Sequence, residues 1–238
     1  MIKKISILIP VFNEIDRIEK CINDVLSVDI EHFDKEIIIS DNNSNDGTKE
    51  YLKNITDKKI KVLFQKINNG KGSNLRNALR YATGDIVIFQ DADMEYPSSN
   101  YHDLIEPFVK FNADVVYGTR LTSAKLTKIL GFPNYVANKI ITIFFNLIFN
   151  KLFTDIETGQ KVFTKKLLDN LDLKSNGFEI EVEVSCKIAS RKNLNIYEVP
   201  IVIDSRRYSE GKKVSIFDFF IAIFSILKWR IFLLFKKK

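Results

Sequence analysis

Short apolar runs alternate with longer helical patterns through the first half of the chain. Runs with the length and apolarity of buried strands occur at residues 5–11, 36–40, 61–65, 85–89 and 113–118. Helical patterns fall between them, at about 13–28, 48–55, 73–82 and 101–112. Strands that alternate with helices at this spacing predict an α/β fold with a doubly wound, mainly parallel sheet.

Polar turns follow the first four of these runs, after residues 11, 40, 65 and 89. In parallel sheets, ligands bind outside the carboxyl ends of the strands. Because all of these turns lie at such ends, we expect their side chains to form one composite ligand site.

The turn after the fourth run holds three carboxylates within five residues, at Asp91, Asp93 and Glu95. A strand end followed by a turn that stops at Pro97 can direct Asp91 and Asp93 to one point. Carboxylate oxygens are the ligands that Mg²⁺ and Mn²⁺ prefer, so this turn is a candidate metal site. The alternative is a solvated acidic turn. We favour the metal because the other polar turns supply a pocket around it.

Gly70, Lys71 and Gly72 lie between a predicted strand and a predicted helix, but they fit neither common phosphate-binding loop. A dinucleotide-binding loop would have a third glycine where this chain has Leu75. A Walker loop would have a glycine at Gln65 and a hydroxyl residue at Gly72. We therefore expect only a helix N-terminus whose free N–H groups favour negative charge.

Asp41 follows directly on the second predicted strand, where a carboxylate can accept hydrogen bonds from a base N–H or a ribose hydroxyl. Asp46 is expected to cap the next helix. The histidines, His32 and His102, lie in helical or loop contexts, and no Ser-His-Asp or Cys-His arrangement is credible. A nucleophile that attacks a carbonyl is therefore improbable.

The composition is that of a folded globular protein, with 45% hydrophobic and 28% charged residues in a chain of 238. Cys21 and Cys186 are far apart and form no CxxC pair, so we expect neither a disulfide framework nor a zinc site. Two unpaired cysteines are typical of a protein in a reducing, cytosol-facing location. The first apolar run is too short for a signal peptide.

Basic residues are concentrated at the C-terminal end of the chain. Residues 204–238 hold nine Lys and Arg against three acidic residues, which gives +6, the net charge of the whole chain. A basic segment that is also rich in aromatic residues indicates an anionic partner: a phosphorylated substrate, a lipid surface or a nucleic acid.

Two segments in the second half, 136–153 and 216–235, are strongly apolar. The first falls short of the roughly 20 apolar residues that span a bilayer, and the second contains Asp218, Lys228 and Arg230. We expect both to be helices on a membrane surface, with the lysines at 236–238 among the lipid headgroups. The alternative is that both pack in the core or against another subunit.

Many short motifs occur together and in order. They lie at 6–14 (SILIPVFNE), at Asp41 with 46–48, and at 69–72, 90–97 (QDADMEYP), 118–120, 155–161, 177–181, 198–201, Arg207 and 211–213. The set resembles glycosyltransferase family 2, and within it the polyprenyl-phosphate branch, the dolichyl-phosphate mannosyltransferase-like enzymes. A single DxD motif would be weak evidence, but this set covers nearly the whole chain.

The resemblance implies a GT-A fold, with a Rossmann-like sheet flanked by helices and amphipathic membrane-interface helices at the C-terminal end. The catalytic domain would span residues 1–213, including apolar interface helices at 134–153, and a basic amphipathic helix would span 214–238. The implied reaction is inverting transfer of a sugar from a UDP- or GDP-linked donor to a polyprenyl (dolichyl or undecaprenyl) phosphate. The implied cofactor is Mg²⁺ or Mn²⁺.

The family roles carry over to matching positions of this chain. Nucleotide binding would fall to Pro10, Val11, Asn13, Glu14, Asp41, Lys71 and Asp91. The metal would be held by Asp93 and Glu95, and the acceptor phosphate by Arg120, Arg207 and Lys213. The catalytic set would be Asp91, Asp93, Arg120 and Arg207. Because the acceptor phosphate is already anionic, this chemistry requires no strong general base.

The chain departs mildly from the family pattern at Phe12, Met94 and Thr119. From the sequence we also expect none of the transmembrane helices that many members of this branch carry after the catalytic domain. We therefore expect a peripheral protein on the cytoplasmic face of a membrane, which reaches the lipid through its apolar helices or through a membrane protein partner. The sequence also leaves open the formation of a homo-oligomer. A nucleic-acid partner is not expected.

Two other functions remain open at the level of sequence. The same fold could act on a hydroxyl of a surface polysaccharide or glycolipid, with Glu179 or Glu181 as the general base that such an acceptor needs. Alternatively, the chain could be a non-catalytic basic module that binds membranes or nucleic acid.

Overall fold

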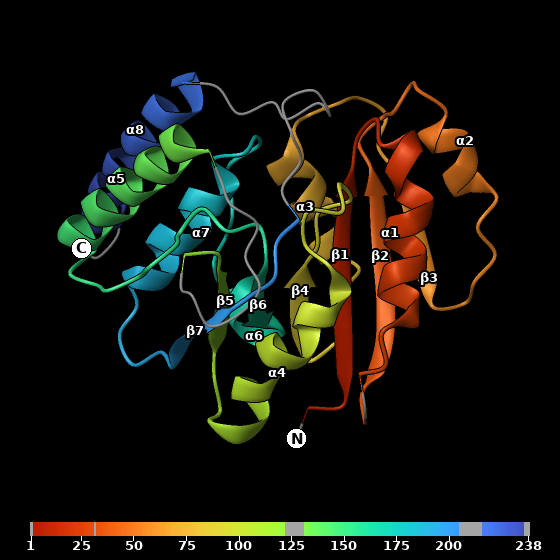
Figure 1. Cartoon of the computed structure of the whole chain (residues 1–238), viewed down its shortest axis with the longest axis horizontal. Coiled ribbons are helices and arrows are strands. Elements are labelled where there is room, and N and C mark those ends of the chain that lie inside the picture. The colour runs from red at the N-terminus through yellow and green to blue at the C-terminus, as the bar shows by residue number, and fades with distance from the viewer. Residues whose placement is uncertain (1, 31, 122–130, 205–215, 236–238) are drawn as a thin grey trace.

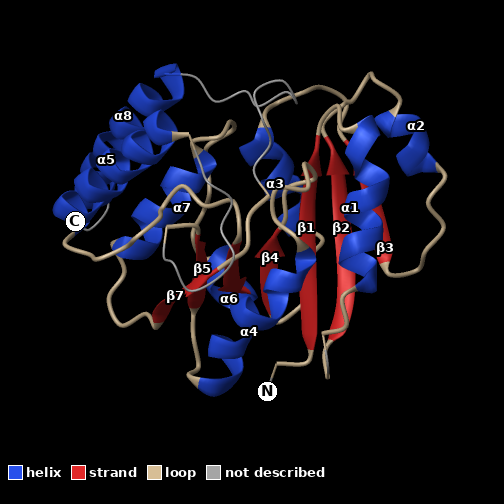
Figure 2. Cartoon of the chain, in the orientation of Figure 1, coloured by secondary structure: helices blue, strands red, loops and turns tan. Residues whose placement is uncertain are grey.

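The computed structural model describes residues 2–30, 32–121, 131–204 and 216–235. Within these ranges, a seven-stranded sheet forms the centre and helices cover both of its faces (Figures 1 and 2). The strand order is β3-β2-β1-β4-β6-β5-β7. The strands are β1 (Lys4–Val11), β2 (Asp34–Asp41), β3 (Ile60–Phe64), β4 (Ile86–Phe89), β5 (Val115–Thr119), β6 (Lys161–Thr164) and β7 (Ile196–Pro200).

The helices follow the strands in the first half of the chain and dominate the second half. They are α1 (Ile15–Ser27), α2 (Thr48–Lys53), α3 (Lys71–Leu79), α4 (Tyr101–Lys110), α5 (Phe132–Phe149), α6 (Lys165–Asp169), α7 (Ile180–Ala189) and α8 (Ile216–Phe235), with a 3₁₀ turn η1 (Ser98–Asn100) before α4.

The sheet is mixed but mostly parallel. Strands β3, β2, β1 and β4 pair in parallel, and so do β5 and β7. Only β6, among the described strands, runs antiparallel to its neighbours β4 and β5. The predicted doubly wound α/β arrangement is confirmed, whereas β6 and β7 are strands that the sequence pattern does not single out.

Strand alternation divides the core between the two faces of the sheet. Ile5, Ile7 and Ile9 of β1 pack on one face with α1, α2 and α4, while Leu8 packs on the other with α3, α5, α6, α7 and α8. Successive side chains of a strand point to opposite faces, so consecutive apolar residues such as Ile7, Leu8 and Ile9 must be covered on both sides of the sheet.

Helix α7 lies between the sheet and α8. All ten of its residues are buried. Toward the sheet, the Tyr117 hydroxyl of β5 donates to Ser185 Oγ at 3.1 Å. On the other side α8 covers α7, and Lys187 lies 4.4 Å above the Trp229 ring. Helix α7 is therefore an internal helix, which explains why its sequence lacks an amphipathic pattern.

Helices α5 and α8 pack against each other at the side of the sheet that ends in β7 (Figure 1). Helix α5 begins at Phe132 and ends at Phe149, where Asn150 takes a left-handed conformation with φ 50°. It thus stops before the end of the apolar segment predicted at 136–153. None of the described helices is long and apolar enough to cross a membrane.

Candidate active site

The polar turns meet at the carboxyl ends of the strands. Asn74 on α3 ties two of these ends together, because its Nδ2 donates to the Val11 carbonyl at 3.3 Å and to the Ser40 carbonyl at 2.6 Å. The Asn74 side-chain oxygen in turn accepts a hydrogen bond from Gln65 at 2.7 Å. One buried amide thus fixes the register of three strand ends beneath the candidate site.

The turns after β1 and β2 interlock. The Asn13 amide donates to Ser44 Oγ at 2.9 Å, and Asn45 donates its amide to the Asn13 side chain at the same distance. Asp41 is fully buried and accepts a hydrogen bond from the Ser44 amide. Pro10 and Val11 form the last two residues of β1, directly before this turn.

Glu14 opens α1 beside the turn that leads into α2. Its amide donates to Thr48 Oγ1 at 3.0 Å, and its carboxylate lies 3.6 Å from Arg17. Asp46 accepts hydrogen bonds from the Thr48 amide and hydroxyl, but Gly47 takes the N-cap position of α2, so Asp46 contacts the first turn from one residue before the cap. The residues predicted to bind the nucleotide near β1 and β2 are therefore brought together at one edge of the sheet.

The acidic turn after β4 has a defined shape. Gln90 is buried, donates to the Tyr96 carbonyl at 2.9 Å and accepts from the Tyr101 hydroxyl at 2.8 Å. Asp93 Oδ1 accepts the Glu95 amide at 3.0 Å, and Met94 adopts φ 63°. These bonds hold the turn rigid, with Asp91 and Asp93 two residues apart within it.

Asp91 forms an ion pair with Lys71 at 2.7 Å, and Lys71 also lies 3.1 Å from Glu181 of α7. Burial raises the pKa of Asp91, and Lys71 opposes that rise. Burial alone would lower the pKa of Lys71, but Asp91 and Glu181 outweigh it and raise that pKa. Lys71 is thus a charged partner of Asp91.

Glu181 sits between two lysines, because Lys161 of β6 contacts its other carboxylate oxygen. Burial raises the pKa of Glu181, but Lys161 and Lys71 overcome this effect and hold the pKa below its ordinary value. Lys161 is itself fully buried and also donates to the Thr158 carbonyl at 2.6 Å. From the sequence, Glu181 is predicted only as an alternative base, and no sequence pattern indicates this series of alternating charges.

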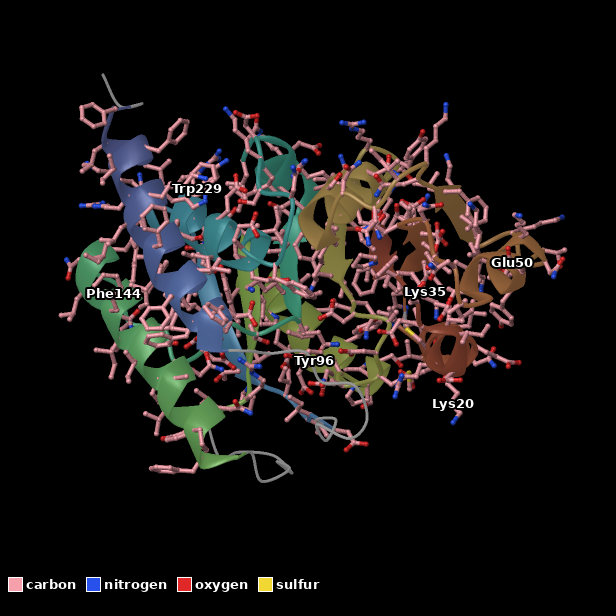
Figure 3. The ribbon with its side chains drawn as sticks, turned by 90° about the horizontal axis from the view of Figure 1, so that it is seen from above. Lys20, Lys35, Glu50, Tyr96, Phe144 and Trp229 are labelled. Carbon is pink, nitrogen blue, oxygen red and sulfur yellow. The ribbon has the colours of Figure 1, made fainter. Side chains whose placement is uncertain are left out.

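Arg120 at the end of β5 is held by Asp155 through two parallel hydrogen bonds of 2.6 and 2.7 Å. Asp155 is fully buried, and its carboxylate raises the pKa of Arg120 against the opposing effect of burial. The hydroxyl of Tyr96, from the acidic turn, accepts the Gly159 amide at 3.0 Å. Figure 3 looks down on this edge of the sheet, with Tyr96 near its middle.

The first turn of α3 is less open than sequence analysis predicts. The Ser73 amide donates to the Asn176 carbonyl at 3.0 Å. A Cβ atom on Gly72 would lie 2.4 Å from the Ser175 carbonyl oxygen, so the 175–177 loop is packed tightly on this turn. The expectation of free N–H groups is therefore wrong for Ser73.

The start of the basic segment is anchored to the acidic turn. The Asp204 amide donates to the Glu95 carbonyl at 2.9 Å, and Val202 exchanges hydrogen bonds with the Asn100 side chain, both of 2.9 Å. Arg207 and Lys213 lie outside the described residues, so their predicted roles stay predictions. Asp204 nevertheless places the beginning of their segment beside the candidate metal turn.

The donor set of the turn suits a hard divalent cation, because Asp93 and Glu95 supply carboxylate oxygens from one rigid turn. Within the described parts of the chain, no group of three or more His, Cys, Asp or Glu side chains is arranged to hold a metal ion. Mg²⁺ is commonly bound by one or two carboxylates together with substrate phosphates and water. The residues fit a metal that is completed by a substrate.

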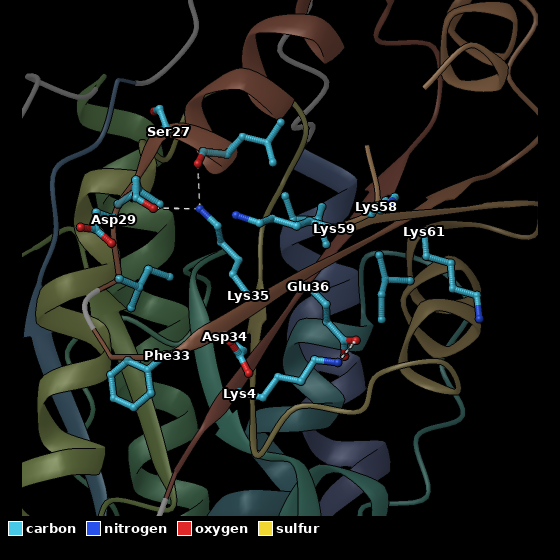
Figure 4. Close-up of a pocket in the computed structure, with 15 residues that line it drawn as sticks. Lys4, Ser27, Asp29, Phe33, Asp34, Lys35, Glu36, Lys58, Lys59 and Lys61 are labelled. Atoms are coloured by element: carbon cyan, nitrogen blue, oxygen red, sulfur yellow. Dashed lines mark hydrogen bonds and ion pairs between the residues drawn. The ribbon is translucent and has the colours of Figure 1, made fainter. Parts of the chain in front are cut away.

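A cavity of about 710 Å³ lies at the opposite edge of the sheet, at the amino ends of β1 to β3 (Figure 4). It contains Lys35, whose Nζ donates to the Val25, Leu26 and Val28 carbonyls at 2.7, 2.9 and 2.8 Å and so caps α1. None of the predicted site residues lines this cavity.

A family model, that of glycosyl transferase family 2, matches residues 6–170. This chain belongs to glycosyl transferase family 2. The match covers every polar turn described above and the loop that carries Asp155. The family assignment made from the sequence motifs is confirmed.

Curated relatives include several that act on dolichyl phosphate, according to their names. Dolichol-phosphate mannosyltransferase of Pyrococcus furiosus is 27% identical over 235 residues, which cover 95% of this chain and 64% of that protein. The UDP-N-acetylglucosamine–dolichyl-phosphate N-acetylglucosaminyltransferase of Methanococcus voltae is 26% identical over 232 residues, which cover 90% of this chain and 91% of that protein. The chain thus spans less than two thirds of the Pyrococcus enzyme.

Solved structures of the same shape include glucosyl-3-phosphoglycerate synthase of Mycobacterium tuberculosis. Its complex with UDP superposes with a TM-score of 0.73 at 18% identity and covers 96% of this chain and 80% of that one. Its complex with Mn²⁺, UDP-glucose and phosphoglyceric acid gives the same TM-score. At this level of identity the likeness shows a shared fold.

Proposed function

We propose that this protein is a GT-A, metal-dependent, inverting glycosyltransferase that moves a sugar from a UDP- or GDP-linked donor to a polyprenyl phosphate. The observation that carries the proposal is the meeting of the acidic turn, Arg120 and the start of the basic segment at one edge of the sheet. Relatives named for a dolichyl-phosphate acceptor, matched over nearly the whole chain, support the acceptor.

The nucleoside would lie over the ends of β1 and β2. Asp41 is buried there among the interlocked turns, and a carboxylate in this place recognises donors such as a base N–H or a ribose hydroxyl. Pro10, Val11, Asn13 and Glu14 would form the wall of this subsite. Asp91 would contact the nucleotide with its position fixed by Lys71.

The diphosphate would lie at the acidic turn, with Mg²⁺ or Mn²⁺ held by Asp93 and Glu95. Such an ion supplies neutralisation of the charge that develops on the leaving diphosphate. Arg120 is preorganised by Asp155 and would stabilise the phosphate charge without reorganising during the reaction. Arg207 and Lys213 follow Asp204 closely in sequence and would add cations for the acceptor phosphate.

The apolar faces of α5 and α8 support an acceptor that is embedded in a lipid surface. Their large exposed side chains include Tyr135, Ile140, Ile143 and Leu147 on α5, and Phe217, Phe220, Phe224, Ile231 and Phe235 on α8. Exposed apolar side chains on two helices that pack against each other are typical of a binding or membrane surface. We propose a peripheral location on the cytoplasmic face of a membrane, with residues 214–238 as the membrane-proximal segment.

A hydroxyl acceptor is the second candidate, and the two bases predicted for it, Glu179 and Glu181, are poorly suited to that role. Glu181 is paired with two lysines that lower its pKa, so it binds protons weakly. Glu179 accepts the Gly177 amide at 3.1 Å, a bond within its own loop. The lipid-phosphate acceptor requires no base and is favoured for that reason.

The proposal is tested by transfer assays with a panel of UDP- and GDP-sugars, with and without polyprenyl phosphate. We expect a glycosylated lipid to form only when Mn²⁺ or Mg²⁺ and the lipid phosphate are both present. Asp93→Ala should abolish transfer, whereas Asp16→Ala, an exposed aspartate on α1, should leave it unchanged. Full activity of Asp93→Ala in EDTA would contradict the proposal.

A further inference from the structure

Glu157 lies on a loop that is fixed at both ends within the candidate site. On one side of it, Asp155 holds Arg120 through two hydrogen bonds. On the other side, the Gly159 amide donates to the Tyr96 hydroxyl, and a Cβ atom on Gly159 would lie 2.6 Å from Asp91 Oδ2. The loop thus runs from the acceptor-side cation to the acidic turn, with Glu157 between them.

The carboxyl group of Glu157 has an unsatisfied acceptor. Its Oε1 atom is buried and has no hydrogen-bond partner among the residues that the structure describes. The nearest cations attract Glu157 electrostatically, but Lys161 donates to Glu181 and Thr158, and Arg120 donates to Asp155. A buried oxygen without a donor is unfavourable, and a ligand that donates a hydrogen bond would satisfy it.

We infer that Glu157 accepts a hydrogen bond from a hydroxyl of the transferred sugar and thereby sets donor specificity. This inference rests on the proposed function. A phosphate is excluded as its direct partner because two anions would repel, and the nucleoside is assigned to the ends of β1 and β2. The neutral, hydroxyl-rich sugar is the part of the donor that remains.

A purely structural role for Glu157 makes a different prediction. If Glu157 served to hold Lys161 and Arg120 in place, its loss would destabilise the fold and weaken phosphate binding. If it serves the sugar, its removal takes away a buried group without a partner, so the folded protein should lose no stability. Groups retained for a ligand commonly cost stability.

The experiment compares Glu157→Leu and Glu157→Gln with wild type, and with Glu106→Gln as a matched control on the exposed surface of α4. Calorimetry with Mn²⁺ measures the Kd of UDP and GDP and then of UDP-glucose, UDP-galactose, UDP-N-acetylglucosamine and GDP-mannose. Donor turnover gives KM and kcat for the same sugars. Thermal unfolding reports the Tm of each variant.

For Glu157→Leu we expect the Kd and KM of the preferred sugar nucleotide to rise about 10- to 100-fold. The Kd of the bare nucleotide and the Tm should stay at the wild-type level, and discrimination between epimeric donors should fall. Glu157→Gln keeps an acceptor oxygen and should recover part of the affinity. Glu106→Gln should behave as wild type.

Two results would overturn the inference while leaving the proposed function intact. One is unchanged donor discrimination in Glu157→Leu. The other is an equal loss of affinity for UDP or GDP alone, accompanied by a lower Tm, which would show that Glu157 positions the cations. If wild type binds neither UDP nor GDP, the proposed function fails, and this inference fails with it.

Discussion

At the scale of single residues, the site is built from buried charges that neutralise one another in pairs. Lys71 lies between Asp91 and Glu181, and Asp155 holds Arg120. Removing one member of a buried pair leaves the other charge without compensation, which costs far more than the pair contributes. The side chains that we propose to bind phosphates, or to hold the residues that bind them, are therefore also residues on which the fold depends.

Asp155→Ala should lower the free energy of unfolding by about 3–5 kcal/mol, because it leaves the Arg120 guanidinium buried without its carboxylate. Urea denaturation followed by circular dichroism measures this change. Asp16→Ala, on the exposed surface of α1, should shift the unfolding midpoint very little. A loss below about 1 kcal/mol for Asp155→Ala would show that water or another acceptor replaces the carboxylate.

At the scale of elements, close packing of loops against helix ends gives the site its rigidity. The 175–177 loop lies on the first turn of α3, and Arg76 donates to the Asn176 side chain at 2.7 Å. The same loop is bound from below by Glu183, whose carboxylate accepts the Lys174 and Ser175 amides at 2.8 and 2.6 Å. Lys71 therefore contacts Asp91 from a helix turn that the 175–177 loop packs against, and Glu183 holds that loop in place.

Gly72→Ala should destabilise the protein by about 1–3 kcal/mol, because its new methyl group would overlap the Ser175 carbonyl oxygen. Displacement of this loop or of α3 should also move Lys71 and raise the Kd for UDP or GDP. Gly131→Ala is the matched control, since the nearest atom to its new Cβ would be 3.9 Å away. An equal free energy of unfolding and an equal Kd for the two variants would contradict this role of the 175–177 loop.

A second prediction at this scale concerns Glu36 of β2, which joins Lys4 of β1 to the residues before β4. Burial raises the pKa of Glu36, but bonds from Lys4, Ser6 and Thr83 outweigh it and lower the pKa from 4.5 to about 2. A lowered pKa in the folded state means that the stabilisation is present above pH 4.5. It is lost as the pH falls toward 2.

Urea denaturation between pH 6 and pH 2 checks this linkage. We expect Glu36→Gln to be less stable than wild type at pH 6, and the difference between the two to shrink as the pH falls from about 4.5 to about 2. Glu106→Gln serves as the exposed control. A difference that stays constant over this range would exclude Glu36 as a contributor to acid sensitivity.

At the scale of the whole molecule, much of the architecture follows from the sequence. The apolar runs in β1, β2 and β4 and the polar turns after them predict a parallel sheet with a site at its carboxyl edge. Strands β6 and β7 are not predicted, because each is short and β7 contains Glu198 and Pro200. Helix α7 is also not predicted from the sequence. It is buried on all sides, so its residues do not alternate between an apolar and a polar face.

The candidate site likewise has residues that the sequence predicts and contacts that it does not. Asp41 stands out because it directly follows a predicted strand, and Asp91 and Asp93 stand out because they lie in the short acidic turn after another. The partnerships of Lys161 with Glu181 and of Arg120 with Asp155 join residues that are 20 or 35 positions apart. Only the reversed direction of β6 brings these side chains together, and local sequence patterns do not encode that reversal.

The exposed apolar face of α5 and α8 leads to a prediction for the whole molecule. The wild-type protein should float with vesicles of anionic phospholipid, and Phe217→Ser/Phe220→Ser/Phe224→Ser should abolish flotation without changing the Kd for UDP or GDP. Val109→Ser/Phe111→Ser, which alters an exposed apolar pair at the end of α4, is the matched control. Flotation of the triple variant at the wild-type level would contradict membrane binding through α8.

The position of α7 beneath α8 has a consequence for how the chain is made. Helix α7 leaves the ribosome before α8 exists, so every nascent chain passes through a stage in which the side of α7 that Trp229 and Ile226 later cover is exposed to water. During that interval the apolar surface of α7 is open to chaperones and to aggregation. Slow synthesis of the segment that joins the two helices would lengthen the exposure, and the yield of soluble protein would then depend on the rate of translation.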